Sequence, residues 1–260
     1  MAVEYDGTEF HGWQFQPRLR TVQGELEAAL TTLLREETRI VGAGRTDAGC
    51  HARGQVASFG TASAMPLERV RHSLAGLLPP DVAVYEVAEA PADFDARRGA
   101  IERWYSYRLL TRPTPLWRRY AWYPGFVPPR ELLERATEPL FGVHDFRGFA
   151  GADPARNGTD GVCRVSRVEW GAWAHGWELC IVANRFLYHM VRNVVGTAVK
   201  VARGTMPVER VRAALTTADR RLAGPTAPPQ GVCLERVVYL GDVVSRPAER
   251  SLRQPAGVLP

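Results

Sequence analysis

The amino-acid sequence predicts an α+β protein made of two similar halves, and two observations support this fold class. In each half, short alternating apolar segments and longer segments with helical apolar spacing follow one another in the order β-α-β-β-α-β. The second half adds one more helix. Strands and helices grouped in this way favour α+β over a parallel doubly wound sheet. No residue-level repeat is evident, so the duplication is an interpretation of element order alone.

The first half begins with an expected strand at residues 2–5, which a glycine-containing loop follows. Thr21 is the expected N-cap of a helix, because apolar residues recur behind it at helical spacing. Pro66 is expected to begin a second helix. The other strands of this half are expected at residues 39–42, 55–59 and 82–87.

The second half begins near Ala96, and its apolar pattern predicts four strands and three helices. The strands are expected at residues 104–110, 163–170, 177–183 and 232–240. The helices are expected at residues 129–137, at about 186–201, and around Val208, Val211 and Leu215. We therefore predict an N-terminal half at 1–97 that carries the Asp47 loop, a C-terminal half at 98–242 and a loosely ordered tail at 243–260.

Bulk properties exclude several classes of protein. The chain has 260 residues, of which 45% are apolar and 23% charged, and these values argue against wholesale disorder. No apolar run approaches the roughly 18 residues that a membrane span needs, and the acidic N-terminus does not resemble a signal peptide. The four cysteines form no Cys-x-x-Cys pair and the six histidines are scattered. We therefore expect a cytoplasmic protein with reduced thiols and no metal site.

A basic and aromatic stretch at residues 97–123 is the clearest charge asymmetry in a chain of formal net charge +5. The stretch contains seven arginines, seven aromatic residues and a single acid, Glu102. Arginine can hold phosphates and aromatic faces can stack on bases, so nucleic-acid binding is one interpretation. A strand with a solvated basic face and an aromatic core is the other. The stretch alone does not separate them.

The most unusual local sequence is the glycine-flanked run at residues 42–49, which contains Arg45 and Asp47. Glycines on both sides permit backbone angles that other residues resist and let a bulky ligand approach. In an extended segment, Arg45 and Asp47 would project to the same side. The arginine would favour the ionised carboxylate, which suits a nucleophile or a base. The alternative is a turn capped by Asp47 with a surface ion pair.

The run Ala43–His51, followed by Gly54-Gln55-Val56, resembles the signature of the tRNA pseudouridine synthase A (TruA) family. The resemblance extends over nearly the whole chain, because further blocks match in the family's order. These blocks are Tyr5–Thr8, Gly12–Gln16, Thr21–Gln23, Phe94–Arg97, Arg103–Tyr107, Gly142–Phe146, Phe186–Asn193, Ala223–Pro229 and Gly231–Leu234.

The resemblance implies a role for individual residues. Asp47 matches the family's catalytic aspartate, and Arg45 matches the arginine that pairs with it and helps to hold the nucleotide. Tyr105 matches the tyrosine that packs beside the target base. Val232 matches an apolar residue that contacts the base, where the family usually has leucine. Arg192 is a second candidate for RNA contact, the alternative being a helix-face arginine in an ion pair.

Three other polar or sulfur-containing residues of the matching blocks are expected to be structural. His189 and Met190 are interpreted as core or interface residues, and Asp145 as the support of a turn. Asp47 is the one carboxylate to which the resemblance assigns chemistry.

The resemblance also implies a reaction and a fold. Family members isomerise uridine to pseudouridine at positions 38 to 40 of the tRNA anticodon arm, without a metal or cofactor. The target base must be flipped out before a carboxylate can reach it. Family members are homodimers that bind tRNA with both subunits. The implied fold has two ferredoxin-like or RRM-like halves whose antiparallel or mixed sheets surround a central RNA-binding cleft.

Two rival functions remain open at the level of the sequence. The first is a non-catalytic RNA-binding protein, which would have no use for the Arg45–Asp47 pair. The second is a hydrolase with Asp47 as nucleophile. A glycosidase of the usual kind would want a second carboxylate and many phosphatases want metal ligands, and neither partner is evident in the sequence.

Overall fold

The computed structural model describes residues 1–152 and 160–241, and the predicted tail at residues 243–260 lies outside the described residues. The described residues form nine strands and five α-helices, and most strand pairs are antiparallel, which confirms the predicted α+β class. The chain divides into two compact units. One unit contains residues 1–103 and the segment that begins at Cys233, and the other contains Trp104–Val232.

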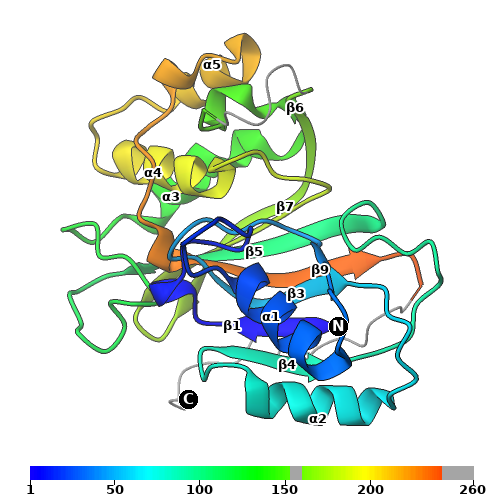
Figure 1. Cartoon of the computed structure of the whole chain (residues 1–260). Helices are drawn as coiled ribbons and strands as arrows, with labels where there is room; N and C mark the ends of the chain where they lie inside the picture. Colours follow the sequence, from blue (N-terminus) through cyan, green and yellow to red (C-terminus); the bar gives the residue numbers. More distant parts are fainter. Residues whose placement is uncertain (153–159, 242–260) are drawn as a thin grey trace. The chain divides into compact units, whose positions relative to one another are not determined.

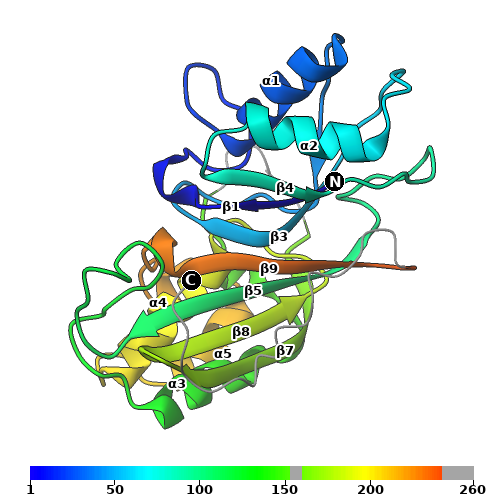
Figure 2. The same ribbon diagram turned by 90° about the horizontal axis from the view of Figure 1, so that it is seen from below.

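The first unit is a sheet with two helices on one face (Figures 1 and 2). The strand order is β4-β1-β3-β9, and β2 pairs with β3. All these pairs are antiparallel except β3 with β9, which is parallel. The strands are β1 (Ala2–Tyr5), β2 (Val41–Gly42), β3 (His51–Ser58), β4 (Val82–Glu86) and β9 (Val232–Tyr239), and the helices are α1 (Val22–Leu34) and α2 (Leu67–Leu77).

Helix α1 begins where the sequence predicts, because its cap and its apolar face agree. The Thr21 hydroxyl accepts a hydrogen bond from the Gly24 amide at 3.2 Å, which satisfies one of the unpaired donors of the first turn. Leu26 and Leu30 are fully buried on the helix face that meets the sheet, as is Leu74 of α2. Burial of such side chains stabilises the unit by roughly 1.5–3 kcal/mol each.

The second unit has the strand order β5-β8-β7-β6, with α3 packed against α4 and in contact with β7. Strands β7 and β8 form the predicted hairpin and pair from Val165↔Ala183 to Trp173↔Gly176, with a register shift between Val165 and Arg167. The strands are β5 (Ala100–Leu110), β6 (Gly142–Asp145), β7 (Val162–Trp173) and β8 (Gly176–Ala183). The helices are α3 (Arg130–Thr137), α4 (Met190–Ala202) and α5 (Glu209–Thr217).

Some expected boundaries are wrong, for local reasons. Helix α4 begins at Met190, four residues after the expected start, because His189 has the left-handed φ of 60° and interrupts the helical backbone. Strand β3 begins at His51 and not at Gln55. Strand β6 was not expected, since a four-residue strand is too short to show an alternating pattern. Along the chain the first unit gives way to the second between residues 103 and 104, and the division into halves at 97 and 98 stays a prediction.

No helix within the described residues has the combination of length and apolarity that crossing a membrane requires.

Candidate active site

Asp47 lies in the first unit, on the irregular segment that joins β2 to β3. Arg45 is exposed, Thr46 is buried and Asp47 is half-buried. This alternation is what an extended segment produces, since every second side chain points to the other side. Thr46 therefore anchors the segment from within, and its two charged neighbours lie nearer the solvent.

The backbone before Arg45 is held by two buried polar side chains. The Gln55 side chain is fully buried, and its amide brackets Gly44: Oε1 accepts from the Gly44 amide at 3.2 Å and Nε2 donates to the Gly44 carbonyl at 2.6 Å. The Arg103 guanidinium donates to the Ala43 carbonyl from Nη2 at 3.0 Å. Both polar groups of Gly44 are thus satisfied by one side chain, which fixes the approach to Arg45.

Thr46 is fixed from two further directions. Its hydroxyl lies 2.7 Å from the Tyr5 hydroxyl, and its carbonyl accepts from the Trp13 amide at 3.0 Å. Gly12 approaches the same carbonyl so closely, at a φ of 92°, that a Cβ there would lie 2.8 Å from the Thr46 oxygen. Gly12 therefore has no room for a side chain, and its backbone lies directly against the Asp47 loop.

The loop is also held after Asp47. The Cys50 amide donates to the Asp47 carbonyl at 3.1 Å, and the Gly49 amide donates to the Phe10 carbonyl at 3.2 Å. A Cβ on Gly7 would lie 1.8 Å from the Cys50 carbonyl oxygen, so the first loop of the chain packs backbone against backbone here. A carboxylate on a segment fixed on both sides has a defined position, which covalent and acid–base catalysis require.

The other predicted site residues belong to the second unit. The Tyr105 ring is buried and meets the Phe186 ring edge-on, with centroids 4.9 Å apart and an interplanar angle of 76°. Val232 is buried at the start of β9. Arg192 on α4 donates from Nε to the Ala227 carbonyl at 2.8 Å, so part of its guanidinium has a structural partner. The structure therefore gives Arg192 a backbone acceptor on the neighbouring segment.

The arginines of the stretch at residues 97–123 divide into two kinds. Arg103 is buried, and besides Ala43 its guanidinium donates to the carbonyls of Arg97 and Ala100. Arg108 pairs with Glu178 at 2.7 Å. These two arginines support the fold. The exposed arginines of the stretch are Arg97, Arg98, Arg112, Arg118 and Arg119.

The cysteines and histidines of the described residues provide no cluster of three or more ligands, counting Asp and Glu, that could hold a metal ion. Among the cysteines, Cys163 is fully buried on β7, and this burial raises the pKa of its thiol to about 11. A thiol in that environment is protonated at neutral pH and is a poor nucleophile.

Comparison with known proteins decides the family. The model of a family described as tRNA pseudouridine synthase matches residues 1–97 and 136–240, which is most of the chain. The chain belongs to this family. It is 43% identical to the tRNA pseudouridine synthase A of Moorella thermoacetica over 244 residues, which cover 92% of this chain and 98% of the relative.

Two further relatives carry the same name. The chain is 41% identical to the protein of Myxococcus xanthus over 242 residues, which cover 92% of this chain and 91% of the relative. It is 42% identical to a protein of Chloroflexus aurantiacus over 258 residues, which cover 98% and 92%. As a tRNA pseudouridine synthase, the chain is an isomerase that acts on uridines of tRNA.

Several blocks that resemble the synthase family have a structural role here. The Asn193 side chain donates to the Phe149 carbonyl at 2.7 Å and accepts from the Thr226 hydroxyl at 2.7 Å and from Arg220 at 2.9 Å. It therefore ties together three segments that are distant in the sequence, around residues 149, 193 and 220–226. Asp145 caps the 3₁₀ turn η3 (Phe146–Phe149) by accepting from the Arg147 amide, which confirms its expected role in a turn.

Two residues that hold the Asp47 loop, Gln55 and Arg103, were not expected there, and Arg103 was counted with the basic stretch for which RNA binding was one interpretation. Gln55 belongs to the matching run, and a glutamine among the apolar and small residues of a strand was the available signal. Arg103 gave no such signal, because an arginine among other arginines looks like part of a basic surface. Only the structure shows that its guanidinium points inward onto three carbonyls.

Proposed function

We propose that this tRNA pseudouridine synthase acts on the anticodon arm of tRNA, at positions 38 to 40, and that Asp47 is its catalytic residue. The observation that carries the assignment is the half-buried carboxylate of Asp47 on a loop that buried side chains fix at Gly44 and at Thr46. The position of Asp47 in the run that resembles the family signature supports the same residue. No cofactor enters this proposal.

The chemistry explains why a fixed carboxylate is needed. In the isomerisation the N-glycosidic bond of uridine breaks, the uracil turns and a C–C bond forms between the same base and sugar. The base must first leave the stack and be held outside it. Asp47 then attacks the sugar or the base covalently, or it removes a sugar proton. All three routes require a carboxylate in a defined position, and the proposal does not choose between them.

We assign the remaining site residues supporting roles. Arg45, which is exposed beside Asp47 in the sequence, pairs with the carboxylate and holds the nucleotide in place of the flipped base. Tyr105 packs beside the target base and Val232 forms an apolar wall. The burial of both side chains suits contacts with a base more than contacts with phosphate. Arg192 is assigned a contact with RNA.

The RNA surface in this proposal includes the exposed arginines of the stretch at residues 97–123, not Arg103 or Arg108. The finer fold follows the resemblance: two ferredoxin-like halves around a central RNA-binding cleft. The element order of the first unit, β1-α1-β2-β3-α2-β4, supports this for one half. We further propose a cytoplasmic homodimer, and light scattering of the purified protein, with and without tRNA, tests the dimer.

The decisive experiment on Asp47 replaces its carboxylate by an amide of the same shape. We expect Asp47→Asn to bind undermodified tRNA within about threefold of the wild-type Kd and to form no product, because the amide is neither nucleophile nor base. Pseudouridine formation is measured by tritium release from 5-tritiated uridine in tRNA, and chemical mapping identifies the modified positions.

The matched control is Asp93→Asn, the same chemical change at an exposed carboxylate of the first unit. It should keep the wild-type rate. Product formation by a clean Asp47→Asn preparation would refute the catalytic assignment. Release of free uracil by the wild-type protein would instead favour the glycosidase alternative.

A further inference from the structure

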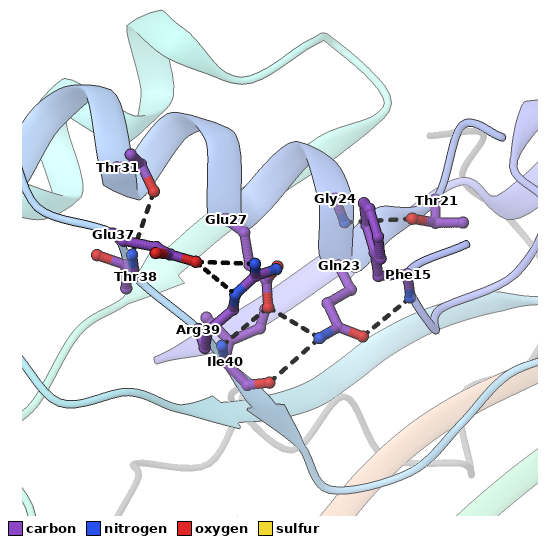
Figure 3. Close-up of polar contacts among 10 residues, drawn as sticks. All are labelled: Phe15, Thr21, Gln23, Gly24, Glu27, Thr31, Glu37, Thr38, Arg39 and Ile40. Atoms are coloured by element: carbon purple, nitrogen blue, oxygen red, sulfur yellow. Dashed lines mark hydrogen bonds and ion pairs between the residues drawn. The ribbon is translucent and has the colours of Figure 1, made fainter. Parts of the chain in front are cut away.

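The buried carboxylate of Glu27 lies at the centre of a polar network on α1, shown in Figure 3. The Glu27 side chain is 8% exposed. Its Oε1 accepts from Gln23 Nε2 at 2.8 Å and from the Ile40 amide at 3.0 Å, and its Oε2 accepts from Arg39 at 3.1 Å. Burying a carboxylate costs free energy unless several hydrogen-bond donors satisfy it. Three donors satisfy the carboxylate of Glu27.

One branch of the network leads to the loop before α1. Gln23, itself buried, accepts with its side-chain oxygen from the Phe15 amide at 3.0 Å. The backbone amide of Gln23 donates to the Trp13 carbonyl at 3.0 Å. The Trp13 amide in turn donates to the Thr46 carbonyl, next to Asp47. Gln23 therefore fixes the loop at residues 12–15, which contacts the segment that carries Asp47.

The other branch leads to the strand that enters the Asp47 loop. The amide of Ile40 is held by Glu27, and Gln23 Nε2 also lies 3.4 Å from the Ile40 carbonyl. Ile40 directly precedes β2, and β2 continues into the loop. The Trp13 ring covers Gly42 of β2 so closely that a Cβ there would lie 2.4 Å from the indole. The two branches thus converge on the backbone on either side of Arg45.

We propose that Glu27, through Gln23 and Ile40, is a positioning residue that sets the place of the Asp47 carboxylate against the substrate. The inference rests on the proposed catalytic role of Asp47. Glu27 touches no reacting atom, and its effect is transmitted by the two segments that it joins. Removing it allows the loop at residues 12–15 and the entry of β2 to shift independently. A displacement of about 1 Å at a catalytic group can reduce the rate about 100-fold.

The test compares single-turnover rates of pseudouridine formation, tRNA Kd and thermal unfolding in a set of variants. We expect Glu27→Ala and Gln23→Ala to slow the chemical step about 10- to 100-fold while Kd stays within about threefold. Glu27→Gln keeps an acceptor oxygen and should restore most of the rate. Gln23→Ala leaves Glu27 with Ile40 and Arg39, so it reports on the network even if Glu27→Ala does not fold.

Two controls separate positioning from simple loss of stability. Leu74→Ala creates a cavity under α2 in the same unit, and it should lower the melting temperature without slowing the folded enzyme. Arg39→Ala removes the outer partner, whose side chain is 68% exposed, and should keep the rate within about twofold. Rates of Glu27→Ala and Gln23→Ala equal to that of Leu74→Ala, at equal folded fraction, would overturn the proposal.

Asp47→Asn is assayed beside these variants. If Asp47→Asn still forms product, the proposed function of Asp47 fails whatever the Glu27 variants do. If Asp47→Asn is inactive and both Glu27→Ala and Gln23→Ala match the wild-type rate, only the positioning role fails. If Glu27→Gln is as slow as Glu27→Ala, the hydrogen-bond explanation of that role is wrong.

Discussion

The Asp47 loop and the surroundings of Asn193 both match family blocks, yet they use polar side chains in opposite ways. At the Asp47 loop, side chains from elsewhere (Gln55, Arg103 and Tyr5) bind the loop or its Thr46 anchor. At Asn193, the side chain of the matching block itself makes hydrogen bonds with three partners within the second unit. A block that matches a family thus carries the proposed catalytic residue in one place and a packing junction in the other.

This difference gives a physical criterion for reading such blocks. A site needs a rigid backbone with its reactive side chain available to a ligand, so the rigidity has to come from donors outside the segment. A structural junction has no such need and satisfies its own side chains internally. Substitutions at the two regions should therefore differ in the ratio of lost activity to lost stability.

Among the residues that hold the two regions in place, the largest effect on activity is expected from Gln55→Ala. The change leaves both polar groups of Gly44 without their buried partner and frees the segment before Arg45. We expect the single-turnover rate to fall about 100-fold, with a loss of about 1–3 kcal/mol in the free energy of unfolding. Val84→Ala, a core change on β4 of the same unit, serves as the stability-matched control. Equal rates for the two variants would remove the distinction between the regions.

The largest effect on stability is expected from Asn193→Ala. It leaves the Phe149 carbonyl, the Thr226 hydroxyl and Arg220 without this partner, and we expect a loss of about 3 kcal/mol in urea unfolding. At a temperature where the variant is folded, its rate should stay within about threefold of wild type. If Asn193→Ala does not fold, Thr226→Val removes one donor only and should show a smaller loss in the same direction. A rate that falls further than the folded fraction would assign this junction to the catalytic machinery.

The sequence predicted most elements of the fold because the local signals were strong. Strand β1 and the start of α1 were correctly placed, since an alternating segment and a threonine cap define them. The start of α4 was missed because nothing in the sequence shows that His189 takes a left-handed backbone angle. Strand β6 was missed because its pairing with β7, over residues 142–145 and 162–165, is a tertiary property.

The candidate site divides in the same way. Arg45 and Asp47 could be singled out because their spacing and flanking glycines are local features. The buried positions of Gln55, Glu27 and Arg103 depend on which distant backbone groups reach them, and no sequence spacing encodes that. The inward direction of Arg103 also reduces the number of arginines that we assign to RNA.

A moderate effect on tRNA affinity is expected from the exposed arginines of the second unit. If Arg112, Arg118 and Arg119 face phosphates, changing all three to glutamine should weaken the salt dependence. The negative slope of log affinity against log salt should decrease in magnitude by about 2. The affinity for tRNA at low salt should fall about tenfold or more, and the rate of pseudouridine formation from the tRNA-bound state should not change. Glutamine at the exposed Arg69 and Arg212 and at the half-buried Arg71 changes the net charge equally, and the same slope change there would point to bulk charge in place of a contact surface.

The smallest effect on the stability of the protein concerns the Cys163 thiol, whose reactivity reports how readily the second unit opens. Burial raises its pKa to about 11, against an ordinary value of 9.0. Between these values the unfolded chain has lost the proton and the folded chain has not, so the thiol favours folding below pH 9 and this preference is lost as pH rises towards 11.

At pH 8 in the native protein, we expect Cys163 to react with a thiol reagent at least 100-fold more slowly than the half-buried Cys180. Asn193→Ala should accelerate labelling of Cys163, because it lowers the free energy of opening the unit in which both residues lie. Labelling of Cys163 that is equally slow in Asn193→Ala would mean that Asn193 holds a local junction only, and that the second unit stays closed without it.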